Sequence, residues 1–230
     1  MTAAVFFDVD FTLIYPGPTF RGPGYREFGA RHGLDLDPAR FDAAVRSAAS
    51  ILDAAQGDIY DPAIFHRYTG RIIEGMGGTG PGVDACAVEI YDQWASNHHF
   101  EMYDDVPDAL TAIHARGIRI GLISNSHRCL VSFQRHFELD GLVAAAISSS
   151  NHGFLKPHPS IFEAALRLMD VPAVDAVMVG DSVGQDIAGA RGIGMRAVLV
   201  RRGADDEPFG GDVDREVPVI HDLRHLLPLL

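Results

Sequence analysis

The chain has 230 residues, of which 47% are hydrophobic, so it can bury a substantial core as one large or two small domains. Its formal net charge of -12 argues against nucleic acid and anionic membrane surfaces as partners, although a bound cation could still recruit an anionic substrate. No apolar run approaches the roughly 18 residues of a membrane span and no secretory signal is evident, so we expect a cytoplasmic protein. We also expect it to be a monomer or a homodimer.

The first predicted element is a short buried strand, AAVFF at residues 3–7, which two carboxylates follow at once. If strand geometry held through Asp10, then Asp8 and Asp10 would point to the same face and repel each other. A polar turn after a strand is also ordinary, so the pair alone does not decide between a turn and a site. Residues elsewhere in the chain are needed to distinguish a turn from a site.

Residues 18–100 predict helices and no strand. Four segments carry apolar residues at three-and-four spacing: GYREFGARHGL, FDAAVRSAASILDAAQ, PAIFHRYTGRIIEGM and GVDACAVEIYDQWA. Breaks rich in glycine or proline, at residues 33, 57–62 and 75–82, separate them. We therefore expect an all-helical block of about four helices.

From about residue 104 predicted strands and helices alternate. The strands are IRIGLIS, LVAAAIS, AVMVG and MRAVLV, and the helices are VPDALTAIHARG, a segment near 130–137, PSIFEAALRLM, QDIAGARG and the C-terminal tail. The acidic, glycine-rich segment 203–216 is predicted to be an exposed loop. Alternation of this kind predicts an α/β fold, a doubly wound, Rossmann-like parallel sheet with helices on both faces. The core would comprise residues 1–16 and 102–230, and an inserted helical domain residues 17–101.

Polar residues gather where the predicted core strands end. In a doubly wound sheet ligands bind at the carboxyl ends of the strands, so these residues are candidates for one site. The candidates are Asp8, Asp10, Thr12, Ser124, Asn125, Lys156, Asp181, Ser182 and Asp186.

Lys156 is the one lysine among the 19 lysine and arginine residues. In a chain so biased toward arginine, a retained lysine suggests a need for a compact ammonium on a flexible stem, which a planar guanidinium cannot imitate. Chance retention is the alternative.

The candidates form a coherent set for phosphoryl chemistry. Asp8 and Asp181 could share a hard cation such as Mg²⁺ through oxygen ligands, which would relieve the repulsion between neighbouring carboxylates. Thr12, Ser124 and Lys156 could then hold the oxygens of a phosphoryl group. One free aspartate could act as a nucleophile and the second as a general acid.

Four segments, DVDFTL, ISNS, LKPHPSIF and GDSVGQD, resemble in this order the four motifs of the haloacid dehalogenase superfamily. The helical block after the first motif is similar to the helical cap of that family. The resemblance spans the whole chain. It implies a Mg²⁺-dependent phosphatase that hydrolyses a small phosphorylated metabolite through an aspartyl-phosphate.

The resemblance also implies roles for most of the candidates. Asp8 would be the nucleophile, Asp10 the acid and then the base, and Lys156 would steady the nucleophile. Thr12 and Ser124 would bind phosphate, and Asp8, the Asp10 backbone carbonyl and Asp181 would bind Mg²⁺. Asp186 is similar to the second acid of the last motif, which would hold Lys156 or a metal-bound water. Apart from the resemblance, Asn125 and Ser182 could donate hydrogen bonds to phosphate or metal-bound water, or could cap the helix that follows.

Phe11 departs from the family pattern, because many members carry glycine there. This leaves in doubt the local turn and access to the site, and not the chemistry. Three alternatives to a phosphatase stay open: a phosphomutase, which would share every motif; a 2-haloacid dehalogenase, which would lack the acid at Asp10; and a non-catalytic protein that binds phosphorylated ligands.

Overall fold

The computed structural model describes residues 2–55, 59–203 and 214–230, which divide between two compact units. Of these residues, the first unit takes in 2–15, 59–60, 102–203 and 214–230, and the second 16–55 and 61–101. Residues 59 and 60 fall within the segment expected to be inserted, yet they join the first unit. Ile59 forms a bridge with Phe154, and the Tyr60 amide donates to the Gly153 carbonyl at 2.9 Å.

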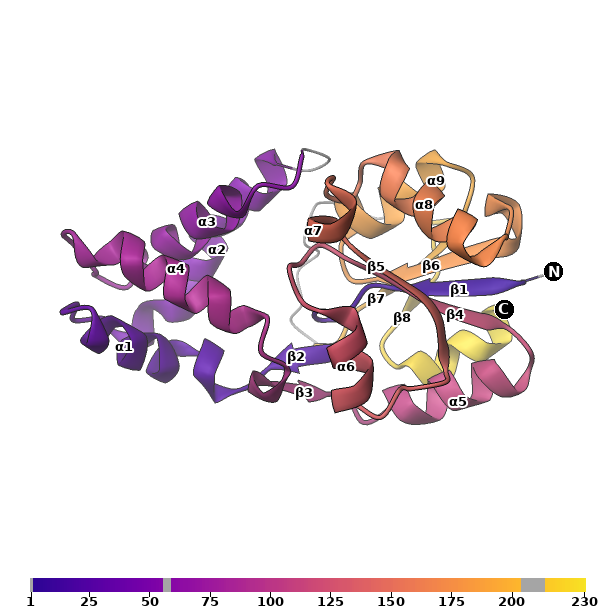
Figure 1. Ribbon diagram of the computed structural model, residues 1–230, viewed down its shortest axis with the longest axis horizontal. Helices are drawn as coiled ribbons and strands as arrows, with labels where there is room; N and C mark the ends of the chain where they lie inside the picture. Colours follow the sequence, from indigo (N-terminus) through magenta and orange to yellow (C-terminus); the bar gives the residue numbers. More distant parts are fainter. Residues whose placement is uncertain (1, 56–58, 204–213) are drawn as a thin grey trace. The chain divides into compact units, whose positions relative to one another are not determined.

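The first unit is built on a six-stranded sheet (Figure 1), in the order β5-β4-β1-β6-β7-β8, in which every neighbouring pair is parallel. Its strands are β1 (Ala4–Phe7), β4 (Arg119–Ser124), β5 (Val143–Ser148), β6 (Ala176–Gly180), β7 (Arg196–Val200) and β8 (Val219–Ile220). The predicted doubly wound α/β fold is confirmed.

Burial on both faces explains the continuous apolar strand sequences. All four residues of β1 are buried, and alternate ones, Ala4 and Phe6, join a core cluster with the apolar side of α8 (Pro159–Met169). Val5 and Phe7 point to the opposite face. Both faces of the sheet therefore need helical cover.

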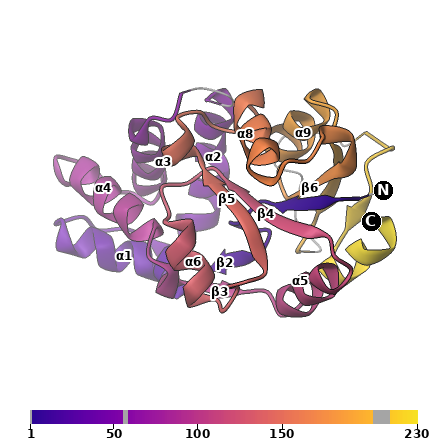
Figure 2. The same cartoon turned by 45° about the vertical axis from the view of Figure 1, so that its right-hand side comes forward.

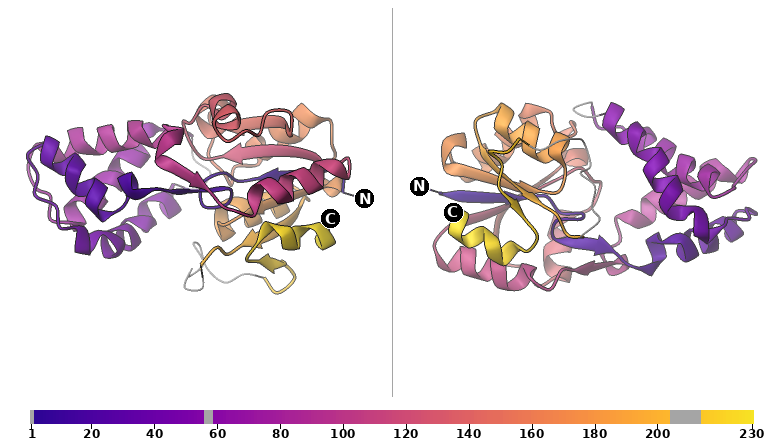
Figure 3. Two further views of the ribbon diagram at one scale, coloured as in Figure 1. Left: turned by 90° about the horizontal axis from the view of Figure 1, so that it is seen from below. Right: turned by 180° about the vertical axis from the view of Figure 1, so that it is seen from behind.

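Helices supply that cover on both sides. In Figures 1 and 2, α8 and α9 (Gly189–Gly192) lie over one face, and α5 (Val106–Ala115) lies over the other. The C-terminal segment Leu223–Leu229 packs beside α5 (Figure 3). It is a 3-10 helix that contains Pro228, which cannot donate a backbone hydrogen bond.

The order of the strands fixes where a site can form. The chain runs outward from β1 through β4 to β5, and then crosses to β6 on the other side of β1. The β1/β6 boundary is thus the switch point of the sheet, where open α/β sheets bind ligands at the carboxyl ends of their strands.

The second unit consists of helices, as its sequence predicts. The α-helices are α1 (Gly22–Arg31), α2 (Phe41–Ala54), α3 (Pro62–Gly75) and α4 (Gly82–Trp94), with 3-10 turns at Pro18–Phe20, Pro38–Arg40 and Asn97–His99. Helix α3 packs against both α2 and α4 (Figure 2). Aromatic rings add to this core, with Phe20 lying 4.6 Å from Trp94 and 5.4 Å from Phe100 between ring centroids.

Two short strands stand where the chain passes between the units, and the sequence did not predict them. They are β2 (Ile14–Pro16) and β3 (Phe100–Met102), which pair in a two-stranded sheet. Three residues are too few to show an alternating pattern.

The short helices and loops of the first unit agree only in part with the sequence prediction. The segment QDIAGARG, predicted as one short helix, is a π-helix (Val183–Ala188) that continues into α9. The helix predicted near residues 130–137 is confirmed as α6 (Leu130–His136), whereas a short helix α7 (Ser149–His152) and a 3-10 turn at Ala173–Asp175 were not predicted. Most of the predicted acidic loop, residues 204–213, lies outside the described residues. No helix among the described residues is long and apolar enough to cross a membrane.

Candidate active site

Asp8 stands directly after β1, at the switch point of the sheet. Its backbone amide still donates to the Val179 carbonyl of β6 at 2.9 Å, so the position of the residue is fixed by the sheet itself. The side chain is 11% exposed, which leaves part of it open to a ligand.

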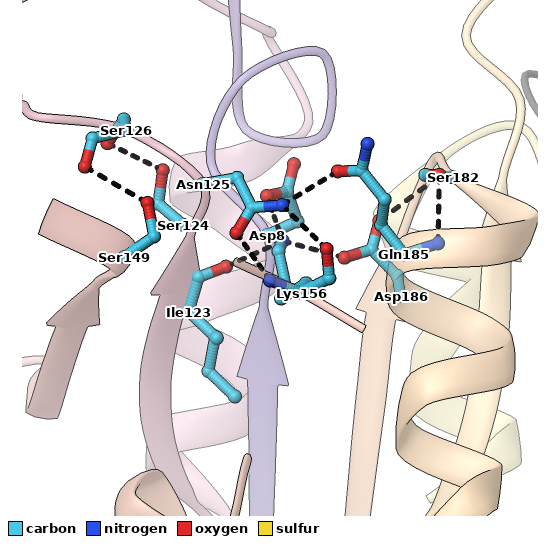
Figure 4. Close-up of polar contacts among 10 residues, drawn as sticks. All are labelled: Asp8, Ile123, Ser124, Asn125, Ser126, Ser149, Lys156, Ser182, Gln185 and Asp186. Carbon is cyan, nitrogen blue, oxygen red and sulfur yellow. Dashed lines mark hydrogen bonds and ion pairs between the residues drawn. The ribbon is translucent and has the colours of Figure 1, made fainter. Parts of the chain in front are cut away.

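Lys156 reaches Asp8 from the loop before α8 (Figure 4). Its Nζ donates to Asp8 Oδ1 at 2.5 Å, to Asp186 Oδ1 at 2.7 Å and to the Ile123 carbonyl at 2.9 Å. All three donor positions of the ammonium are thus used. With 1% of its side chain exposed, Lys156 is a buried cation held between two carboxylates.

Asp186 is held in place by Ser182, the residue that precedes its π-helix. The Ser182 amide donates to Asp186 Oδ2 at 3.1 Å, which leaves Oδ1 to accept from Lys156 (Figure 4). The carboxyl group lies against Gly180, where an added Cβ would come within 2.3 Å of it. Glycine at the end of β6 therefore makes room for the Asp186 side chain.

Asn125 braces the Lys156 loop. Its Oδ1 accepts from the Lys156 amide at 2.7 Å, and its Nδ2 donates to the Lys156 carbonyl at 3.1 Å and to Gln185 Oε1 at 3.0 Å (Figure 4). A single side chain at the end of β4 thus connects the segments that carry Lys156 and Asp186. Ser182 supports the same region, since its hydroxyl accepts from the Gln185 amide at 3.2 Å.

The carboxyl groups are crowded, and this sets their electrostatics. Burial raises the pKa of Asp8 to about 7, against the opposing attraction of Lys156. Asp181 is partly exposed, yet desolvation and the negative charges of Asp8 and Asp186 raise its pKa well above the ordinary value. Burial would lower the pKa of Lys156, but the charges of Asp186 and Asp8 outweigh burial and raise it.

These carboxylates fit a divalent cation. Asp8, Asp181 and Asp186 each offer an oxygen, and the three atoms lie within 4.8 Å of one another. Carboxylate oxygens are the ligands that Mg²⁺ prefers. One ammonium offsets part of the negative charge, and the raised pKa values of Asp8 and Asp181 indicate that more positive charge would be accommodated.

Asp10 lies in a different environment from Asp8. Its Oδ1 accepts from Arg128 Nη2 at 2.9 Å, and its side chain is 17% exposed. Two carboxylates that are two residues apart in the sequence thus have different cationic partners, Lys156 for Asp8 and Arg128 for Asp10. Divided environments of this kind are typical of carboxylates with divided roles.

Thr12 and Ser124 are both buried near the strand ends. Thr12 Oγ1 has no hydrogen-bond partner among the described residues, and a buried hydroxyl in that state calls for an explanation such as a ligand or a water molecule. Ser124 donates to the Ser126 hydroxyl at 2.9 Å (Figure 4). The two hydroxyls therefore differ, because that of Ser124 already has a protein partner.

Phe11 adopts the left-handed conformation, with φ of 63°, and is 41% exposed. Residues other than glycine visit this region at a cost. The unusual residue at this position therefore takes a backbone conformation that glycine adopts without strain.

Sequence reasoning missed two residues of the site, Arg128 and Gln185. Arg128 is the largest fully buried side chain of the described structure, yet it is one of 18 arginines and nothing in its local sequence marks it as buried. Its place four residues after Ser124, in the loop that follows a core strand, was the available signal.

Comparisons with known proteins point the same way as the geometry. The family model for haloacid dehalogenase-like hydrolases matches residues 2–194. The human haloacid dehalogenase-like hydrolase domain-containing protein 3 is 27% identical over 225 residues, which cover 91% of this chain and 86% of that protein. A ribulose-1,5-bisphosphate 5-phosphatase of Halopiger xanaduensis is 27% identical over 203 residues, which cover 86% and 84%.

Solved structures share the fold over the whole chain. A phosphatase from Thermococcus onnurineus matches with a TM-score of 0.64 and 22% identity, over 100% of this chain and 97% of that one. A 2-haloacid dehalogenase from Pseudomonas syringae matches with a TM-score of 0.63 and 26% identity, over 100% and 98%. The matched structures thus include a protein named as a phosphatase and a protein named as a dehalogenase.

Proposed function

The chain belongs to the haloacid dehalogenase-like hydrolases, and from this premise we propose that it is a Mg²⁺-dependent phosphatase acting on a small phosphomonoester. The observation that carries the proposal is the pairing of Asp8 with a buried lysine while a second carboxylate, Asp10, lies two residues away. A dehalogenase has no use for that second acid, whereas transfer of a phosphoryl group to an aspartate requires a proton for the departing oxygen.

In the first half of the reaction Asp8 attacks phosphorus. Lys156 holds Asp8 Oδ1, so Oδ2 is the oxygen that forms the new bond. As the bond from phosphorus to the ester oxygen breaks, Asp10 gives its proton to that oxygen, and the alcohol leaves. The product is an aspartyl-phosphate on Asp8.

In the second half Asp10, now a carboxylate, takes a proton from water. The resulting hydroxide attacks phosphorus, the bond to Asp8 breaks, and inorganic phosphate leaves. Lys156 again stabilises the carboxylate that is released. One residue thus acts as acid and then as base, as the reversal of proton flow requires.

Bound Mg²⁺ would neutralise the charge of the phosphoryl oxygens. Asp8, Asp181 and the backbone carbonyl of Asp10 would hold it, and Asp186 would support the site through Lys156. The phosphoryl oxygens would be bound by the hydroxyls of Thr12 and Ser124 and by the backbone amide of Asn125, since both hydrogens of the Asn125 side-chain amide already have protein partners. Thr12 Oγ1 has no partner among the described residues.

We also propose that the helical unit is the cap that selects the substrate. The name of one relative, the ribulose-1,5-bisphosphate phosphatase, indicates a small sugar phosphate for that protein. A phosphorylated metabolite of similar size is the substrate class that we expect here.

A screen of phosphorylated metabolites, with and without Mg²⁺, tests the proposal by release of inorganic phosphate. Asp8→Asn removes the nucleophile and should abolish turnover, by at least about 10⁴-fold, while circular dichroism shows an unchanged fold. Asp140→Asn, which removes an exposed carboxylate of the same unit, is the matched control and should keep full activity.

Other outcomes would favour the alternatives. Release of halide from 2-haloacids would support a dehalogenase, and transfer of phosphate within a sugar would support a mutase. Binding of phosphorylated ligands without turnover would indicate a non-catalytic protein. Phosphate release that survives Asp8→Asn would exclude the aspartyl-phosphate route.

A further inference from the structure

Arg128 carries a buried positive charge next to Asp10. Its side chain is 0% exposed and lies in the loop between β4 and α6, and the acid it contacts follows β1. Because β1 and β4 are neighbouring parallel strands, the loops at their carboxyl ends meet at the same edge of the sheet. A guanidinium from one loop thus reaches a carboxylate of the other.

Burying the Arg128 guanidinium is energetically unfavourable unless it has a compensating role. Removing a guanidinium from water costs several kcal/mol, and replacing a buried ion pair by apolar side chains is often neutral or stabilising. The pair of Arg128 with Asp10 is therefore weak evidence for a contribution to stability. Its placement at the acid of the proposed reaction suggests instead that it serves that acid.

The geometry of the contact is suited to positioning. Arg128 Nη2 donates to Asp10 Oδ1 at 2.9 Å. One carboxylate oxygen is thereby held, and Oδ2 is left to exchange a proton with a substrate. Arginine forms such contacts with a fixed planar geometry, whereas a lysine ammonium on its flexible stem would define the direction less well.

We propose that Arg128 is a positioning residue that orients Asp10 toward the oxygen of the leaving group. The inference rests on the proposed function and adds a residue to its machinery. It makes a prediction that a merely structural role does not make: Arg128 should matter in proportion to how much the leaving group needs a proton.

The test compares two esters of similar shape, phenyl phosphate and 4-nitrophenyl phosphate. Phenolate needs protonation to leave, and 4-nitrophenolate hardly does. The ratio kcat/KM reports the steps through departure of the leaving group. Arg128→Gln should lower kcat/KM about 100-fold for phenyl phosphate and about fivefold or less for the nitrophenyl ester. Arg128→Lys should fall between Arg128→Gln and the unaltered protein.

A double-mutant cycle separates positioning from structural damage. In an Asp10→Asn background the acid is already lost, so Arg128→Gln should cost no more than about twofold further. Arg135→Gln, which removes an exposed arginine of α6, is the control and should change neither substrate. If Arg128→Gln does not fold, Arg128→Lys carries the same comparison.

Several outcomes would overturn the inference alone. Equal losses on both esters that persist in the Asp10→Asn background would show direct phosphate binding or a structural role. A gain in kcat would show that Arg128 restrains the acid instead of directing it. By contrast, if the unaltered protein released no phosphate from either ester with Mg²⁺, the proposed function would fail and the inference with it.

Discussion

At the scale of single residues, the loop after β1 combines an acid, a strained aromatic residue and a buried hydroxyl in succession. Phe11 holds a φ of 63°, and its amide donates to the Ile14 carbonyl at 2.7 Å. The turn brings Asp10 to Arg128 while the chain doubles back toward β2. Strain retained beside proposed catalytic groups is a common sign that the local shape serves function.

The strain at Phe11 predicts an inverted order of stability for two substitutions. At an ordinary position alanine is more stable than glycine, because glycine loses more chain entropy on folding. Here Phe11→Gly should be more stable than Phe11→Ala by about 1 kcal/mol, since only glycine relieves the left-handed strain. Urea unfolding of both variants measures the difference. An alanine variant as stable as the glycine variant would show that the turn relaxes.

The identity of Lys156 gives a second prediction at this scale. Lys156→Arg keeps the positive charge, but a planar guanidinium cannot place three donors on Asp8, Asp186 and the Ile123 carbonyl as the ammonium does. We expect kcat to fall about 100-fold or more in the phosphate-release assay. Arg167→Lys, the converse exchange at an exposed position of α8, should leave kcat unchanged. Full activity of Lys156→Arg would mean that this lysine was retained by chance.

At the scale of elements, Arg202 connects four parts of the core. Its guanidinium donates to the Thr12 carbonyl, to Asp105 Oδ2 at 2.6 Å, and stacks on Tyr103 at 4.1 Å from the ring centroid. Asp105 precedes α5 and also accepts from the Leu223 amide, where the C-terminal 3-10 helix begins. The end of β7, the loop after β1 and two helix starts are thus joined through one ion pair.

This network predicts a large loss of stability for a single change. Arg202→Gln would leave the Asp105 carboxylate buried without its cation, since the two side chains are 9% and 5% exposed. We expect a loss of about 3 kcal/mol in the free energy of unfolding. Arg71→Gln breaks an exposed pair with Glu74 and should cost less than about 1 kcal/mol. Similar losses for the two variants would show that the Arg202 pair is solvated.

The sequence predicted the elements of the core better than their connections. Apolar runs and glycine punctuation are local, so β1, β4 and α8 could be predicted from them. The π-helix at Val183–Ala188 and the three-residue strands β2 and β3 have no local pattern. Their form depends on tertiary contacts, such as the hydrogen bond that Lys156 donates to Asp186 within the π-helix.

The same division holds for the candidate site. Spacing after core strands predicted that Asp8, Lys156 and Asp186 would meet, and they are in contact. The partner of Asp10 was not predictable, because burial of Arg128 arises only when the β1 and β4 loops pack together. Whether Asn125 binds substrate stays a prediction, and its contacts with Lys156 and Gln185 show a bracing role in addition.

At the scale of the whole molecule, folding must keep three carboxylates together against their repulsion. One buried lysine opposes Asp8, Asp181 and Asp186. Because burial raises the pKa of Asp8 to about 7, folding favours its protonated form. The stability contributed by this protonation is fully present below the unfolded pKa and is lost as the pH rises through about 7. In the metal-free protein, the charges of these carboxylates should therefore impose a penalty on the free energy of unfolding at neutral and alkaline pH.

This penalty predicts a pH-dependent response to Mg²⁺. The ion competes with protons for the carboxylates, so its stabilisation of the fold should grow as the pH rises from about 5 to about 8. At Mg²⁺ about 100 times above its dissociation constant the gain would be about 2.7 kcal/mol. Thermal unfolding with Mg²⁺ or with EDTA at both pH values measures this gain.

The variant Asp181→Asn tests whether these carboxylates bind the ion. It should weaken the response to Mg²⁺, and without metal it should be more stable than the unaltered protein at about pH 8, because one repelling charge is gone. A Mg²⁺ effect equal at both pH values, or unchanged by Asp181→Asn, would place the ion away from these carboxylates.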